Sequence, residues 1–273
     1  MAEIDRAAVK QYWENAEATV LGPYMMDGFG FPVGAGNFRF RAETRIVRRL
    51  VANIRHKDKV LDLGSGVGYW AEELAGNFSK VVAVEGSAKL FRALAERCAP
   101  YANVEPILGN VMAFEPGGSY SLVFSGGLLM YLNESDVIEL LRRLAPRLGP
   151  DGIILCREST VRGETVKRDG EYSVIYRSVP EYAQIFKRCG LVLHSVERNE
   201  PYVLMQMGCE LIKTWKSFVP ERFQALWMMG RLTYWSLRLG NPWINRIPQA
   251  LGIPFPRLEN HFFVLGAGPM ASG

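Results

Sequence analysis

The chain has 273 residues, of which 48% are hydrophobic and 22% are charged. This length and composition predict one large folded domain, or one domain with an added lid, and exclude a disordered chain. The net charge of +4, with basic and acidic residues mixed along the chain, gives no indication of nucleic-acid binding. We find no basic leader, no run of ~18 uncharged apolar residues and no C-x-x-C pair, so we expect a cytoplasmic protein with reduced thiols.

Residues 1–57 are expected to form an N-terminal helical cap. Within it, residues 5–18 predict a helix that carries Tyr12 and Trp13. A second helix is predicted over about residues 40–54, because apolar side chains recur there at helical spacing. Its several arginines are expected to form a solvated face.

A predicted strand, residues 59–63, leads into three alternating glycines from Gly64 to Gly68 and then into a helical pattern. This order indicates a buried strand, a tight turn and a helix whose first amides face a ligand. It is not the G-x-G-x-x-G of dinucleotide sites, because Tyr69 stands at the sixth position. Asp62, at the end of the strand, would repel a pyrophosphate but suits a ligand that carries an ammonium or sulfonium.

The next two strands also end in polar groups. Glu85 closes the strand 80–85 and is placed to accept both hydroxyls of a ribose. The strand 103–108 leads to Asn110, whose side-chain oxygen suits the exocyclic amine of an adenine. With the glycine turn, these residues resemble the class I S-adenosylmethionine (SAM)-dependent methyltransferases, over roughly residues 10–200. The resemblance implies SAM as the cofactor, S-adenosyl-L-homocysteine as the product, and no metal.

Strands and helices alternate through residues 58–197, and this order predicts a mostly parallel sheet with helices on both faces. Together with the resemblance, it gives an α/β fold: a Rossmann-like, seven-stranded sheet that forms the SAM-binding core. Residues 259–273 are expected to supply the last, antiparallel strand and a C-terminal tail. The other predicted elements are strands 120–125, 153–157 and 191–196 and helices 68–77, 88–98, 134–147 and 181–188.

The resemblance implies a cofactor site made by the turn, the ends of the strands and the N-terminal aromatic helix. Its expected residues are Trp13, Asp62, Gly64, Ser65, Gly66, Tyr69, Glu85, Gly86, Ser87, Asn110, Val111, Ser125 and Gly126. Methyl transfer is an in-line displacement, so the protein mainly aligns the acceptor with the methyl carbon and excludes water.

A hydroxyl acceptor must lose its proton, so a general base would help. Glu158, directly after the strand 153–157, is the first candidate base or acceptor-binding group, and Tyr131 is the second catalytic candidate. The alternative is that Glu158 only pairs with a neighbouring arginine. The expected substrate-binding residues are Tyr172, Tyr176, Arg177 and Trp227.

Residues 198–258 do not belong to the minimal fold and are rich in aromatic residues and methionine. A helix is predicted over 222–239, where Trp227, Arg231, Tyr234 and Arg238 form a basic and aromatic stripe. This insert is interpreted as a lid over the acceptor or a contact in a homodimer. The alternative is a peripheral contact with a membrane surface or a lipid-linked acceptor.

The N-terminal part contains Tyr12–Trp13, Thr19–Val20, Gly22 and Gly28–Phe29. This pattern resembles the α-N-terminal protein methyltransferases. That family carries a histidine where Met130–Leu132 stands here, and Asp–Asn in place of Glu158–Ser159. These departures make that family the second choice. Because Glu158 supplies a carboxylate and the aromatic insert could stack on a sugar or an apolar group, we expect O-methylation of a hydroxyl on a saccharide, glycolipid or secondary metabolite. The alternatives are N-methylation of a terminal amine of a peptide or small molecule, and SAM or partner binding without turnover.

Overall fold

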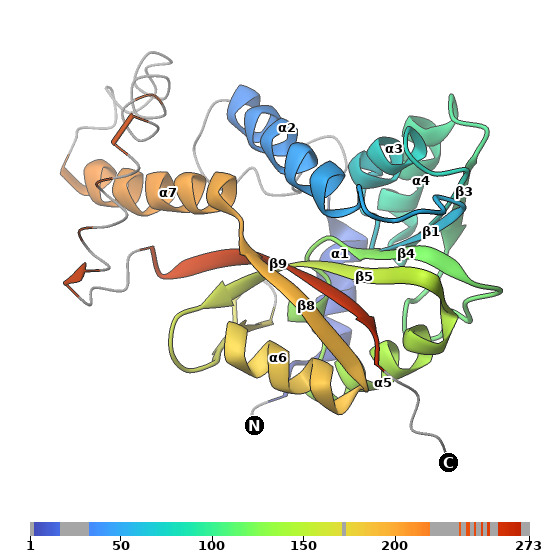
Figure 1. The fold of residues 1–273 in the computed structure, drawn as a ribbon. Coiled ribbons are helices and arrows are strands. Elements are labelled where there is room, and N and C mark those ends of the chain that lie inside the picture. Colours follow the sequence, from blue (N-terminus) through green and yellow to red (C-terminus); the bar gives the residue numbers. More distant parts are fainter. Residues whose placement is uncertain are drawn as a thin grey trace.

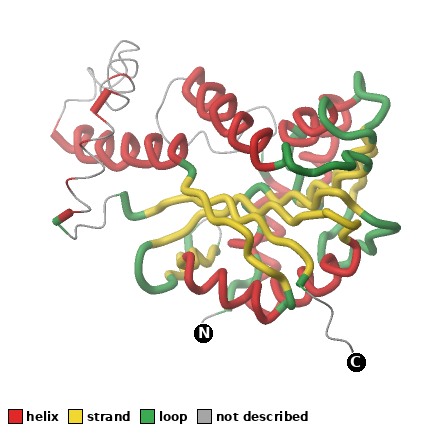
Figure 2. Tube along the Cα trace, viewed as in Figure 1, coloured by secondary structure: helices red, strands yellow, loops and turns green. Residues whose placement is uncertain are grey.

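The computed structural model describes residues 3–16, 33–170, 173–218 and 256–268, with a few positions between 235 and 251. A central, mostly parallel sheet carries helices on both faces, as expected (Figure 1). Figure 2 shows the same layering, with strands in the middle and helices above and below. The expected α/β class is therefore confirmed, although the sheet contains more strands within the described residues than the seven expected.

The sheet has the strand order β3-β2-β1-β4-β5-β7-β6, and β9 pairs with both β5 and β8. The strands are β1 Lys59–Leu63, β2 Lys80–Glu85, β3 Val104–Leu108, β4 Tyr120–Ser125, β5 Leu148–Val161, β6 Val166–Arg168, β7 Val174–Ser178, β8 Leu191–Arg198 and β9 Leu258–Ala267. Strands β1 to β5 run parallel, whereas β9 is antiparallel to both of its neighbours. The carboxyl ends of β1, β2 and β4 therefore meet at one edge, where ligands of such sheets bind.

Strand β5 is 14 residues long and continues well past the strand expected over 153–157. Its neighbour β4 ends where Ser125 pairs with Cys156. Beyond that point Thr160 pairs with Arg177 of β7, which takes the edge that β4 leaves. The hairpin of β6 and β7 lies between the predicted strand 153–157 and the predicted helix 181–188, where no strand was expected. The polar residues Glu158 to Thr160 hid this extension, because they are buried in spite of their polarity.

The helices cover the two faces unequally. They are α1 Arg6–Asn15, α2 Val33–Leu50, α3 Tyr69–Ala75, α4 Ala88–Cys98, α5 Glu134–Leu144, α6 Val179–Arg188 and α7 Glu200–Phe218. Helices α2, α3 and α4 pack on one face, and α5 and α6 on the other (Figure 1). Side chains alternate between the two faces along β1. Val60 therefore packs in the core that α2, α3 and α4 cover, and Leu61 packs in the core that α5 and α6 cover.

The helices outside the predicted core, α1, α2 and α7, agree only in part with the predicted bounds. Helix α1 starts after Asp5, whose Oδ1 accepts from the amides of Ala7 and Ala8 as expected of its cap. Helix α2 starts at Val33, earlier than predicted. Helix α7 occupies the first part of the aromatic insert and contacts α2, whereas the predicted helix 222–239 lies almost entirely outside the described residues. Across the described ranges, no helix is long and apolar enough to cross a membrane.

Candidate active site

The glycine turn after β1 has the backbone that its sequence predicts. Gly64 and Gly68 have φ angles of 66° and 88°, in the left-handed region that favours glycine. A Cβ at Gly68 would also lie 2.8 Å from Cδ1 of Leu94. The amides of Gly64 and Ser65 donate to the carbonyl of Val84 on β2, so the turn is fixed against the next strand.

Glu85 closes β2 beside this turn. Its carboxylate accepts from the amides of Gly66 and Ser87, each at 2.8 Å. Burial raises the pKa of Glu85, and these amide hydrogen bonds oppose the rise. Backbone donors therefore fix the orientation of the carboxylate that the sequence predicts as the acceptor of the ribose hydroxyls.

A single cavity of about 700 Å³ extends from the glycine turn past the ends of β2 and β4 to β7 and α7. This volume is in the range of small-molecule sites. Most of the expected cofactor residues line it: Trp13, Gly64, Ser65, Gly66, Tyr69, Glu85, Gly86, Ser87, Asn110, Val111 and Gly126. Tyr131 and Tyr176 line it as well, whereas Asp62, Ser125, Glu158 and Arg177 do not. Tyr172 and Trp227 lie outside the described residues.

Asp62 lies beneath the turn and is only 1% exposed. Burial raises its pKa to about 7, and the nearby Glu85 carboxylate adds to the rise. Its Oδ2 atom has no hydrogen-bond partner within the described part of the chain. Because Asp62 does not line the cavity, its expected part in cofactor binding stays a prediction, and it would act through the turn above it.

Glu158 is fully buried behind the turn that follows β4. Its Oε1 atom accepts from Ser125 Oγ at 3.2 Å and from the amides of Leu128 and Leu129 at 3.1 and 3.0 Å. Burial raises its pKa to about 7 against these hydrogen bonds. The structure thus places Glu158 where it holds the turn, and not where it would contact an acceptor.

Arg177 holds the same turn from its other side. Its guanidinium donates to the carbonyls of Leu129 and Leu132, at 2.9 and 2.7 Å, and is fully buried. Arg177 was expected to bind substrate, but its side chain is committed to this turn and does not line the cavity. Together, Glu158 and Arg177 fix the segment that presents Met130 and Tyr131 to the cavity.

Aromatic side chains form the wall opposite the glycine turn. Trp13 of α1 meets Tyr131 edge to face, with ring centroids 5.3 Å apart. Tyr176 of β7 carries the guanidinium of Arg168 at 5.5 Å from its ring. Tyr202 of α7 completes this wall. Such a wall excludes water and suits a cationic or apolar group.

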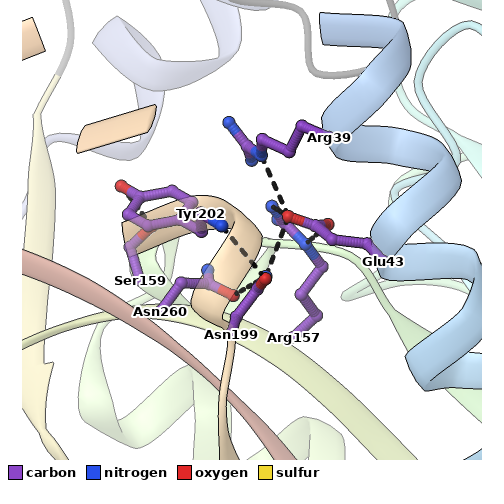
Figure 3. A network of polar contacts seen from close by, with 7 residues as sticks. All are labelled: Arg39, Glu43, Arg157, Ser159, Asn199, Tyr202 and Asn260. Atoms are coloured by element: carbon purple, nitrogen blue, oxygen red, sulfur yellow. Dashed lines mark hydrogen bonds and ion pairs between the residues drawn. The ribbon is translucent and has the colours of Figure 1, made fainter. Parts of the chain in front are cut away.

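Sequence reasoning missed a buried polar network beside this wall. Arg39 and Glu43 of α2, Arg157 of β5, Asn199 and Tyr202 interact there (Figure 3). The arginines of the predicted second helix are exposed, as expected: Arg41, Arg45, Arg48 and Arg49. Arg39, just before that predicted helix, is only 6% exposed. Its i,i+4 spacing to Glu43 was a signal for pairing, although not for burial.

The residues that line the cavity fit SAM. Glu85 can accept from the ribose hydroxyls, and the turn glycines leave room for a nucleoside against the backbone. Asn110 lines the cavity, but its Oδ1 atom accepts from the Met112 amide, so it also shapes its own turn. No group of three or more metal-binding side chains occurs among the described residues.

Comparisons with known proteins find similar methyltransferases. A phosphoethanolamine N-methyltransferase of Arabidopsis thaliana is 26% identical over 64% of this chain, a match that covers only 36% of that relative. An alpha N-terminal protein methyltransferase of the same plant is 28% identical over 67% of this chain and 69% of its own length.

A solved SAM-dependent methyltransferase of Leishmania major shares the fold, with a TM-score of 0.64 at 17% identity over 95% of this chain and 82% of its own. The family model described as AdoMet-dependent proline di-methyltransferase matches residues 2–205. With its glycine turn, its Glu85 and its sheet of this topology, the chain belongs to that family of class I SAM-dependent methyltransferases.

Proposed function

We propose that the protein transfers a methyl group from SAM to an amine nitrogen of a peptide terminus or a small molecule. The sequence alone favoured O-methylation, with the amine as the alternative. The comparisons support the alternative, because the similar curated proteins above are named as N-methyltransferases or N-terminal protein methyltransferases.

The observation that carries this proposal is the state of the carboxylates on the cavity wall. Within the described residues, Glu85 accepts from backbone amides, Asp136 pairs with Arg6, and Glu14 pairs with Lys10. Glu158 stands behind the turn and does not line the cavity. A hydroxyl acceptor needs a base, whereas an amine needs only to arrive unprotonated. The wall therefore suits an amine better than a hydroxyl.

When bound, SAM supplies an electrophilic methyl group on a sulfonium. The chain contributes alignment: the glycine turn and Glu85 orient the nucleoside, and the turn held by Glu158 and Arg177 fixes the opposite wall. Trp13 and Tyr131 keep water from the space between. Holding the two reactants in line lowers the entropic part of the barrier.

The test is a matched acceptor screen with the full chain and SAM. Peptides with a free N-terminal proline or alanine, and small amines, are compared with N-acetylated peptides, sugars and phenols, with methylation read by mass spectrometry. We expect a mass gain only on the unblocked amines. Methylation of the hydroxyl acceptors, with none on the amines, would overturn the proposal.

A further inference from the structure

The network in Figure 3 brings two guanidinium groups onto one carboxylate. Glu43 accepts from Arg39 Nε at 2.9 Å and from Arg157 Nε and Nη2 at 2.6 and 3.1 Å. Asn199 Nδ2 donates to the same carboxylate at 2.9 Å. With four donors on it, Glu43 is an anchor for the two arginines and is poorly placed to receive an acceptor's ammonium.

Both guanidinium groups belong to the cavity wall. The cavity lining includes Arg39, Arg157, Ser159 and Tyr202. We call this part of the cavity its acceptor end. Arg157 also lies close to the turn after β4, since a Cβ built on Gly127 would stand 3.9 Å from its Nη1 atom. An acceptor whose nitrogen faces this turn would thus bring a neighbouring group within reach of the arginines.

The arginines are fixed before any acceptor arrives. The Arg39 guanidinium carbon stands 4.7 Å from the centre of the Tyr202 ring, and that of Arg157 stands 5.9 Å from it. Tyr202 is in turn held by two hydrogen bonds: its amide donates to Asn199 Oδ1, and its hydroxyl oxygen accepts from Ser159 Oγ. A guanidinium held in one plane is suited to a carboxylate or phosphate, whose two oxygens match its fork of donors.

We propose that Arg39 and Arg157 bind an oxyanion of the acceptor, so that the substrate is a small amine carrying a carboxylate or phosphate near its nitrogen. This inference rests on the proposed N-methylation and narrows its substrate class. Arg168, on the same cavity wall, adds positive charge at this end. Cationic neighbours also lower the pKa of an acceptor ammonium, which raises the fraction of the neutral nucleophile.

The test compares acceptors that share an amine and differ in the anion. The pairs are phosphoethanolamine with ethanolamine, and β-alanine with β-alaninamide, so that phosphate and carboxylate are separate arms. We expect wild type to prefer the anionic member of at least one pair by tenfold or more in kcat/KM. Arg39→Gln should lower kcat/KM for the anionic member of that pair about tenfold and should leave kcat/KM for the neutral member within threefold of wild type. Equal loss on both members, or no preference in wild type, would overturn the proposal.

Two further variants separate loss of the guanidinium from loss of the fold. Arg39→Lys keeps the charge beside Glu43 but removes the fork, and Arg48→Gln removes an exposed arginine of the same helix that pairs with Glu73 outside the cavity. Arg48→Gln should behave as wild type. Melting curves of all variants check that the buried network still folds.

A binding measurement separates this proposal from the proposed function. Calorimetry with phosphoethanolamine and β-alanine, at saturating S-adenosyl-L-homocysteine, needs no turnover. At least tenfold weaker binding to Arg39→Lys than to wild type supports the oxyanion site even if no amine is methylated. Equal affinities, or no binding of either compound, overturn the site even if other amines are substrates.

Discussion

The two ends of the cavity are built in opposite ways. In the part of the cavity where the cofactor is expected, most of the lining groups come from one continuous stretch, from the turn after β1 to the segment after β3, and backbone amides orient Glu85. At the acceptor end, the wall is assembled from α1, α2, β5, β7 and α7, and side chains are held by other side chains. Changes at the first end should therefore act on SAM binding, and changes at the second on the acceptor.

The largest effect is expected at Glu85. A glutamine there presents an amide donor where two hydroxyl donors would arrive, so Glu85→Gln should weaken SAM binding about hundredfold, or about 2.7 kcal/mol. Calorimetry with SAM measures it. Glu105→Gln, on the exposed edge of β3, is the matched control. If Glu85→Gln bound SAM as wild type does, the cofactor end would be assigned wrongly.

Glu158 tests whether the acceptor end uses a base. Its hydrogen bonds to the turn amides can be made by a glutamine oxygen, so Glu158→Gln should keep kcat within about threefold. Glu158→Ala leaves those amides unpaired and should cost about 2 kcal/mol of stability and about tenfold in kcat. Steady-state kinetics and urea unfolding separate the two variants. A loss of turnover as large in Glu158→Gln as in Glu158→Ala would instead identify a general base.

Two glycines with similar backbones allow the turn itself to be probed. Gly68 and Gly163 have φ angles of 88° and 84°, but a Cβ meets Leu94 only at Gly68, with nothing within 4 Å at Gly163. Gly163→Ala should cost about 1 kcal/mol of unfolding free energy, and Gly68→Ala about 2 kcal/mol. Only Gly68→Ala should also weaken SAM binding. Equal costs would mean that Leu94 yields without strain.

The smallest effect concerns pH. Burial raises the folded-state pKa of Asp62 and of Glu158 to about 7, above their ordinary values of 3.8 and 4.5. Between those values the folded state binds more protons than the unfolded state, so both groups make stability fall as pH rises toward 7. Urea unfolding at pH 6 and 8 should show a difference about 1.4 kcal/mol smaller in Asp62→Asn than in wild type. An unchanged difference would show that Asp62 titrates normally.

The same contrast explains what could be predicted from the sequence. The strands 59–63, 80–85 and 120–125 and the helix 88–98 match the structure to the residue, because their signals are local: apolar runs, glycines and caps. Most cofactor residues that were predicted from the turn pattern line the cavity. Their contact with SAM stays a prediction, since position alone does not test it.

The acceptor end could not be predicted in this way. Glu158 was expected to face an acceptor because it follows a predicted strand, and Arg177 was expected to bind substrate. Each instead forms hydrogen bonds with the turn at 128–132. Arg39 and Glu43 lie more than 100 positions from Arg157, and no local pattern reports such a contact. The residue patterns gave an amine acceptor only as the alternative, and the comparisons with known proteins made it the preferred proposal.

The length of β5 has a consequence for how such proteins diversify. Its first half is paired with β4, and its last residues are paired with β7, so one strand supports both ends of the cavity in succession. Replacement of the β6–β7 hairpin or of α7 would then alter which molecule is methylated without disturbing the donor side. Homologous chains that keep this long strand are natural starting points for exchanging acceptor preference by segment swaps.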